Sequence, residues 1–350
     1  MKDVVLAQGQ SEKSEQEPTG SRRLLSVDAL RGLAIVVMLL AGNPFMRPDV
    51  PAQLKHPEWH GLRFADLFFP LFLFVVGIAM TLSRRTADGR QVARRVIVLY
   101  LIGVALTTLK HGSLGLRGVL QHIAGSYLLA WFVLRAPRRA QPVLAGGILL
   151  FTWLIYQLYA GGDDPWREGA TAAHALEDAV FGTFSTEGVL QVIASSVTVL
   201  GGAFVGRGIR DHPEARSLAR WVTRHAAWLL SAALLLAFLV PINKRIWTPS
   251  FTLLSLGTSC AFFAFFIWIL DIKGWRRWSA PLRDLGANPI ALYIGYIALT
   301  AVAESFAEHA PNLAPFGSET AGATIYCLGW LVLGVLVAHW LFRRKILIKI

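Results

Sequence analysis

Charged residues and cysteines are scarce in this chain of 350 residues. Asp, Glu, Lys and Arg make up 16% of it, whereas a soluble chain usually carries about 25%. Its 2 cysteines are too few for a disulfide framework or a four-ligand zinc site. Hydrophobic residues make up 54% of the chain and the mean hydropathy is +0.50. This composition argues against two soluble domains and predicts a membrane protein.

Long apolar runs take the place of charge. A membrane-spanning helix needs about 20 mostly apolar residues. Ten runs approach that length: 27–43, 62–82, 92–109, 118–134, 143–159, 188–205, 222–240, 251–270, 289–303 and 321–341. They are continuous, unlike the alternating segments of a β-barrel. We therefore predict an all-α, polytopic membrane helical bundle with about ten transmembrane helices.

Acidic residues number 22 against 34 Lys and Arg, and the net charge is +12. The basic residues lie in short segments between the apolar runs, and 26 of the 34 fall on the side that holds the N-terminus. The positive-inside rule then places both termini in the cytoplasm. We expect the bundle to lie in the cytoplasmic (inner) membrane. Because topology and lipid head groups explain the charge, we expect no nucleic-acid partner. Residues 1–21 are polar and predict a disordered cytoplasmic tail, followed by a transmembrane domain at 22–350.

The segment after the first predicted span is the richest in polar residues. Asn43 ends that span, and His56, Trp59, His60 and Asp66 follow in the first outward loop and the start of the second helix. A neutral imidazole is a good general base or nucleophile, and an asparagine can position a carbonyl or an oxyanion. One alternative is a metal site on the two histidines, which nearby proline and glycine residues disfavour, and we expect no metal. The other is an interfacial loop with a Trp anchor and solvated histidines.

Other polar residues lie at predicted helix ends. As candidate substrate contacts we select Trp59, His60, Asp66, Gln121, Glu187, Asn243, Lys244, Trp247 and Asn288. The acids in the outer segment 161–187 form either a solvated face or an attractive site for a cationic amine.

Basic residues on the cytoplasmic face are candidates for holding a phosphorylated cofactor, because Arg suits bidentate phosphate contacts. We select Asp28, Arg31, Arg343, Arg344 and Lys345. Asp28 and Arg31 share one face of a helix, so they either pair with each other or contact an anionic ligand.

Eight pieces of the sequence, in order, resemble the heparan-α-glucosaminide N-acetyltransferase family of transmembrane acyltransferases. They are RLLSVDALRG (23–32), the pair Asn43 and His56, HPEWHGLRFADLFFPLFLFVVG (56–77), RGVLQHIAGSYLL (117–129), TEGVLQVIASSVTVLGG (186–202), PINKRIWTPSFTLLSLG (241–257), LGANPIALYIG (285–295) and FRRKILIKI (342–350). The resemblance covers nearly everything after residue 22.

The resemblance implies a transmembrane N-acetyltransferase that takes acetyl from cytosolic acetyl-CoA and acetylates an amino sugar across the membrane. It implies that His56 is the active histidine and Asn43 its partner, whereas His60 stands where the lysosomal member has asparagine. It further implies a homodimer among membrane lipids, with acetyl-CoA as donor and a sugar-type acceptor. We expect a bacterial-type member without the N-terminal luminal domain.

Two questions stay open at this point. His56 either removes a proton from the attacking amine or carries the acetyl group as an acyl-imidazole. In both cases the thioester arm of acetyl-CoA has to pass through the bundle. The alternative function is a transporter or flippase of a polar glycan or glycolipid, although mid-span charges are scarce and we find no convincing internal repeat.

Overall fold

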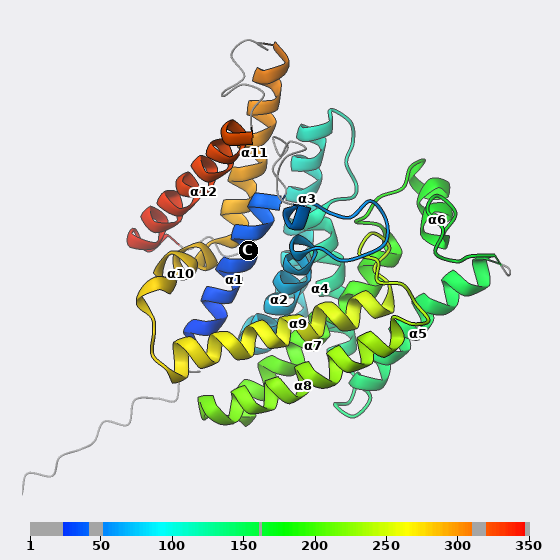
Figure 1. Ribbon diagram of the computed structural model, residues 1–350, viewed down its shortest axis with the longest axis horizontal. Helices are drawn as coiled ribbons and strands as arrows, with labels where there is room; N and C mark the ends of the chain where they lie inside the picture. Colours follow the sequence, from blue (N-terminus) through cyan, green and yellow to red (C-terminus); the bar gives the residue numbers. More distant parts are fainter. Residues whose placement is uncertain (1–23, 42–51, 161–162, 310–319, 347–350) are drawn as a thin grey trace, which may run out of the picture.

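The computed structural model describes residues 24–41, 52–160, 163–309 and 320–346, and the regular elements within these ranges are helices (Figure 1). The α-helices of this part of the chain are α1 (Leu25–Ala41), α2 (Phe68–Leu82), α3 (Gly89–His111), α4 (Val119–Arg135), α5 (Gln141–Ala160), α6 (Ala172–Phe181), α7 (Val189–Asp211), α8 (Ala215–Leu236), α9 (Pro249–Phe266), α10 (Ala280–Ala287), α11 (Pro289–His309) and α12 (Thr320–Arg343). The prediction of an all-α fold is confirmed. Asn43 and the predicted tail at 1–21 lie outside the described residues.

Several of these helices are long and apolar enough to cross a membrane. Within the described ranges there are 5: Phe64–Leu82, Gly89–His111, Gln141–Ala160, Val189–Asp211 and Pro249–Ile272. Pro289–Ala298 and Leu331–Arg343 are shorter apolar helices. The helices α1 and α4 have 17 residues each, at the lower limit for a span. The chain is a multi-pass membrane protein, and its count of about ten crossings stays a prediction.

Three helical segments differ from the sequence-based expectation. The outer segment 161–187 contains α6, which Thr171 caps and the left-handed Gly182 ends. The helix α8 begins at Ala215, well before the apolar run at 222–240, and α10 was not expected at all. Hydropathy detects apolar runs only, so it overlooks a helix that is short or that begins with an amphipathic turn.

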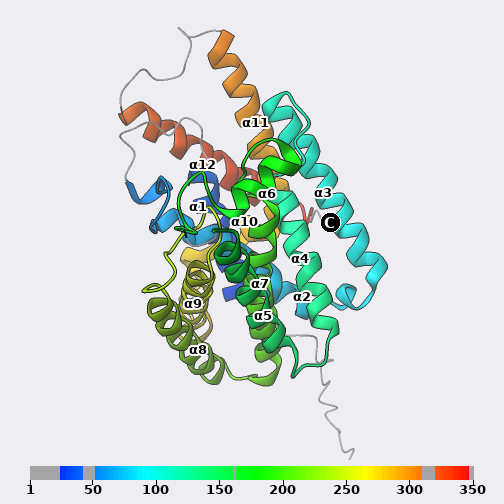
Figure 2. The same cartoon turned by 90° about the vertical axis from the view of Figure 1, so that its right-hand side faces the viewer.

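Close packing of α2 against α7 forms the centre of the bundle, and most of α2 is buried. A Cβ atom on Gly77 would collide with the carbonyl oxygen of Val199, and one on Gly202 with that of Phe74. Glycines at these positions let the two backbones approach closely, as is usual for helices packed in membranes. The helices α1, α4 and α9 pack around this pair, and α8 runs alongside α9 (Figures 1 and 2).

The connecting segments gather at two ends of the bundle. At one end the start of α1, α10 and the end of α12 meet, and Arg31 Nη1 donates to the Gly286 carbonyl at 3.1 Å. At the other end the segment before α2 meets the segment around α6, and Trp59 Nε1 donates to the Trp166 carbonyl at 2.7 Å. Segments expected on the same side of the membrane therefore contact each other. Which compartment each end faces stays a prediction.

Candidate active site

The turn between α8 and α9 is fixed by its own polar groups. Thr248 Oγ1 donates to the Pro241 carbonyl at 2.8 Å and accepts the Asn243 N–H at 3.0 Å. Asn243 Oδ1 accepts the Ile246 N–H at 3.2 Å. The buried Trp247 adopts a φ of 54°, in the left-handed region that bulky residues rarely occupy. Strain of this kind persists only where the surroundings allow one shape, so the turn presents its side chains at fixed positions.

This turn brings Lys244 to His56 and Asp66. His56 Nδ1 lies 2.6 Å from Asp66 Oδ1, and Lys244 Nζ lies 3.3 Å from the same oxygen. Lys244 Nζ also lies 3.2 Å and 3.4 Å from Nδ1 and Nε2 of His56. The Asp66 side chain is 0% exposed and that of His56 is 44% exposed. The Asp66 carboxylate is therefore buried, whereas the His56 imidazole is partly exposed and accessible to a ligand.

The carboxylate sets the tautomer of the imidazole. A carboxylate only accepts hydrogen bonds, so His56 Nδ1 carries the proton and Nε2 keeps its lone pair. Asp66 is held in turn by the Arg63 N–H, which donates to Oδ2 at 2.8 Å. Burial lowers the pKa of Lys244, and the charge of Asp66 opposes this shift. The His56 imidazole, held in this tautomer, can remove a proton or attack a carbonyl through Nε2. The role of Asn43 as its partner stays a prediction.

Trp59 and His60 face other partners. The Trp59 ring is 8% exposed, and its centroid lies 5.4 Å from that of His174. His60 Nδ1 lies 3.2 Å from Asn243 Nδ2. His56 and His60 thus use their Nδ1 atoms on different groups rather than on one shared centre, and His56 is the histidine with the carboxylate.

A buried histidine of α4, His122, also lies near this group. His122 Nε2 lies 2.7 Å from Ser195 Oγ, which lies 2.6 Å from Ser126 Oγ. The His122 ring centroid lies 5.3 Å from that of Trp247. All four side chains are buried. Single polar residues inside apolar helices gain meaning only when the fold shows which of them meet, so sequence reasoning could not assemble this set.

A cavity of about 740 Å³ lies next to the segment before α2 that carries His56 and Trp59, here called the His56 loop. Its walls come from α3, α11 and the segments 113–121 and 180–187, and it is lined by Gln121 and Glu187. The structure thus brings together two sequence-predicted substrate contacts from distant parts of the chain. The ring of Phe184, in the same wall, lies 6.3 Å from that of Trp59, so the cavity and the His56 loop are neighbours.

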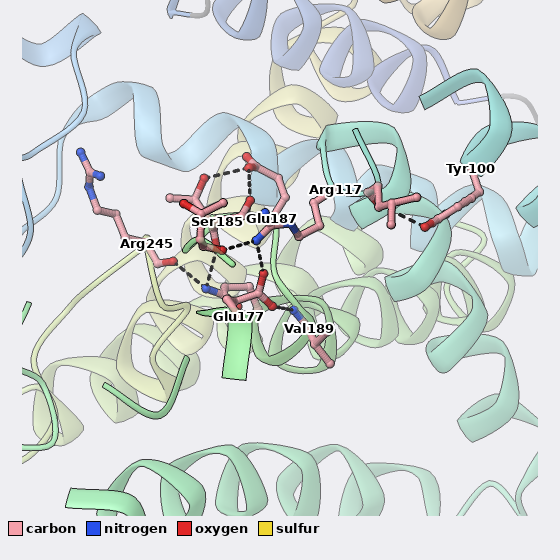
Figure 3. A network of polar contacts seen from close by, with 11 residues as sticks. Tyr100, Arg117, Glu177, Ser185, Glu187, Val189 and Arg245 are labelled. Carbon is pink, nitrogen blue, oxygen red and sulfur yellow. Dashed lines mark hydrogen bonds and ion pairs between the residues drawn. The ribbon is translucent and has the colours of Figure 1, made fainter. Parts of the chain in front are cut away.

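A buried ion pair fixes the wall at 180–187 (Figure 3). Arg117 Nη1 lies 2.6 Å from Glu177 Oε2 and donates to the Thr183 carbonyl at 2.7 Å. Glu177 Oε1 accepts the Val189 N–H at 2.9 Å, and its side chain is 1% exposed. For this acid the expectation of a solvated face is wrong, because Arg117 neutralises it inside the protein.

The remaining predicted residues lie at the other end of the bundle. Asp28 and Arg31 pair at 3.6 Å, as their spacing predicts, and Arg31 also bonds α10. Asn288 Nδ2 donates to the Ile346 carbonyl at 2.9 Å, so Asn288 joins the end of α12 rather than the His56 group. The predicted cofactor contacts Arg343, Arg344 and Lys345 are exposed at this end. Their charge fits a phosphate-bearing ligand.

Comparisons with known proteins identify the family. A family model described as heparan-alpha-glucosaminide N-acetyltransferase, catalytic, matches residues 23–240, more than half of the chain. The heparan-alpha-glucosaminide N-acetyltransferase of Mus musculus is 25% identical over 96% of this chain and 62% of its own length. That of Homo sapiens is 26% identical over 94% of this chain and 60% of its own length. The chain spans about three fifths of the length of these curated relatives, and it belongs to the heparan-alpha-glucosaminide N-acetyltransferase family.

Proposed function

We propose that the protein is a membrane-embedded N-acetyltransferase that moves an acetyl group from cytosolic acetyl-CoA to an amino sugar or related acceptor on the extracytoplasmic side. The observation that carries the proposal is the exposed His56 imidazole, whose Nδ1 lies 2.6 Å from the buried Asp66. Both curated relatives are named for N-acetyl transfer, which supports the same reaction class here.

His56 acts through Nε2 in either of two routes. In a direct transfer, Nε2 takes a proton from the amine as its nitrogen bonds the acetyl carbon, and the C–S bond breaks to release CoA thiolate. In a two-step transfer, Nε2 first forms an acyl-imidazole and releases the thiolate, and the amine then takes the acetyl group. The amine proton finally reaches the thiolate or solvent. Both routes need a neutral His56 ring whose Nδ1–H donates a hydrogen bond to the Asp66 carboxylate.

Lys244 is suited to stabilise the oxyanion. Its Nζ lies 3.4 Å from His56 Nε2, where a thioester carbonyl would be attacked. A fixed cation near the carbonyl oxygen favours the tetrahedral state over the substrate. Asn43 remains part of the proposal as a further donor, on the strength of the family resemblance.

The proposed topology delivers the donor from the opposite end of the bundle. We place the CoA phosphates at the basic end, near Arg31 and the α12 terminus, with both chain termini in the cytoplasm. Single cysteines at the exposed Glu58 and Arg344 test this with a membrane-impermeant maleimide. We expect labelling at 58 in intact cells and labelling at 344 only after permeabilisation. The reverse pattern would refute the topology.

The function is tested by acetyl transfer from labelled acetyl-CoA to glucosamine in membranes. His56→Ala is expected to lower the rate at least about 100-fold, the scale of a lost general base. His225→Ala is the matched control, because His225 is exposed on α8. Equal activity in both variants would remove His56 from its role. Glycan flux across liposomes without any acyl donor would favour the transporter alternative.

A further inference from the structure

The geometry points to the cavity beside the His56 loop as the subsite that binds the acceptor, an unacetylated amino sugar. Glu187 binds the ammonium of this sugar. Gln121 accepts a hydrogen bond from one of its hydroxyl groups or from the ammonium. This inference rests on the proposed N-acetyltransferase function and assigns the contacts that recognise its acceptor.

The cavity has the size and lining of a small-molecule site. Its volume of about 740 Å³ lies within the range of roughly 300–1,000 Å³ for ligand pockets, which combine apolar walls with a few placed polar groups. Leu106, Phe184 and Tyr293 contribute apolar and aromatic surface. Gln121 and Glu187 contribute a buried amide and a half-buried carboxylate.

Gln121 has an acceptor atom without a donor. Its side chain is buried, and Nε2 donates to Thr107 Oγ1 at 3.2 Å and to the Gly115 carbonyl at 3.1 Å. These bonds fix the orientation of the amide. Its Oε1 is buried and has no hydrogen-bond partner in the described part of the chain. Buried acceptors are normally paired, so a hydroxyl or ammonium of a bound ligand would complete this one.

Glu187 supplies the negative charge. Its Oε2 accepts hydrogen bonds from Thr186 Oγ1 at 2.9 Å and Ser185 Oγ at 3.4 Å (Figure 3). Among the described residues, no Lys or Arg nitrogen lies within ion-pair distance of this carboxylate. Glu177, in contrast, is neutralised by Arg117. A half-buried carboxylate without a cation favours a ligand ammonium through a charge-assisted hydrogen bond.

The cavity wall and the Lys244 turn are tied together. Gln191 Nε2 donates both to the Ser185 carbonyl at 3.2 Å and to the Arg245 carbonyl at 3.1 Å. Ser185 is two residues before Glu187 and Arg245 directly follows Lys244, so this one amide holds the two segments side by side. An acceptor nitrogen held at Glu187 is therefore close to the group that transfers the acetyl. The ammonium loses one proton to solvent to become the free amine, and His56 Nε2 takes the second proton as the nitrogen bonds the acetyl carbon. The acetylated product is a neutral amide, so it loses the attraction of the carboxylate and leaves.

Binding without acetyl-CoA tests this inference directly. The full chain in nanodiscs is titrated with glucosamine and with N-acetylglucosamine, and binding is followed by calorimetry. We expect glucosamine to bind more tightly than N-acetylglucosamine. Glu187→Gln and Gln121→Leu should each weaken glucosamine binding about tenfold or more, the effect of losing a hydrogen bond to a charged group. Glu168→Gln, at an exposed acid outside the cavity, is the matched control.

Thermal unfolding checks that each variant is folded, and Glu187→Asp should restore part of the affinity. No binding of glucosamine by the unaltered chain, or equal affinity in the variants at 187 and 168, would overturn the inference. Acetyl transfer is measured on the same preparations. If Glu187→Gln transfers acetyl with an unchanged KM for the amine, the subsite is refuted and the proposed function stands. If the unaltered chain binds the amine through Glu187 but transfers no acetyl, the subsite stands and the proposed function is refuted.

Discussion

Replacing Asp66 with asparagine is the sharpest test of the site, because the change alters one charge and almost no volume. Asp66 receives three donors: His56 Nδ1 at 2.6 Å, Lys244 Nζ at 3.3 Å and the Arg63 N–H at 2.8 Å. The amide has one acceptor oxygen and an NH₂ group that only donates. Whichever way the amide turns, its NH₂ group meets a donor.

The size of the effect follows from these contacts. A hydrogen bond to a charged group is worth about 1.5–3 kcal/mol, which corresponds to roughly a 10- to 150-fold change in rate. Without the carboxylate, the His56 proton is free to move to Nε2, where it blocks the lone pair. We therefore expect kcat/KM for Asp66→Asn to fall at least about tenfold. The loss should appear mainly in kcat, because Asp66 is buried beneath the imidazole.

The assay is steady-state acetyl transfer from labelled acetyl-CoA, with Asp88→Asn as the matched control. Asp88 caps the start of α3 at the other end of the fold, and asparagine caps helices equally well. Activity of Asp66→Asn within twofold of the unaltered chain would refute the role of Asp66. A loss that is fully explained by a lower melting temperature would do the same.

Three further predictions concern charge, pH and packing. In Lys244→Met the ammonium 3.4 Å from His56 Nε2 is gone, so kcat in the same acetyl-transfer assay should fall by about 100-fold or more, the scale of a lost oxyanion donor. Burial lowers the pKa of His174 below its ordinary 6.5, so stability should be complete above that value and fall as pH drops below it. His174→Gln should flatten this dependence of melting temperature on pH. Gly202→Leu should lower the melting temperature strongly, because its side chain meets the α2 backbone, whereas Gly146→Leu, in open space, should not.

The helices were predictable because their apolar runs are continuous, and the boundaries were predictable only where polarity changes sharply. The helix α8 shows the limit. Its first turns carry Arg216, Arg220 and Arg224 four residues apart, so the cations share one face while the opposite face is apolar. An average over a window mixes the two faces and places the start of the helix too late.

The site was predictable in part. The residue type and the family motif singled out His56, and Asp66 was assigned to the substrate rather than to the histidine. His56 and Asp66 are ten positions apart, and the sequence between them does not reveal that the carboxylate folds back beneath the ring. The contact with Lys244 joins residues 188 apart in sequence, and no local pattern encodes it. Only the strained turn at Trp247 and the packing of the helices set that distance.

The ion pair of Asp66 and Lys244 also ties the active group to the stability of the fold. It joins the turn just before α2 to the turn between α8 and α9, and the Asp66 side chain is 0% exposed. Removing one partner of such a pair leaves an uncompensated charge, which costs more than removing both. The unfolding free energies of Asp66→Asn, Lys244→Met and the double variant form a mutant cycle. We expect the double variant to lose less unfolding free energy than the two single variants lose together, by at least about 1 kcal/mol. Additivity within about 0.5 kcal/mol would mean that the two charges do not interact, and that Lys244 reaches His56 for a reason other than its attraction to Asp66.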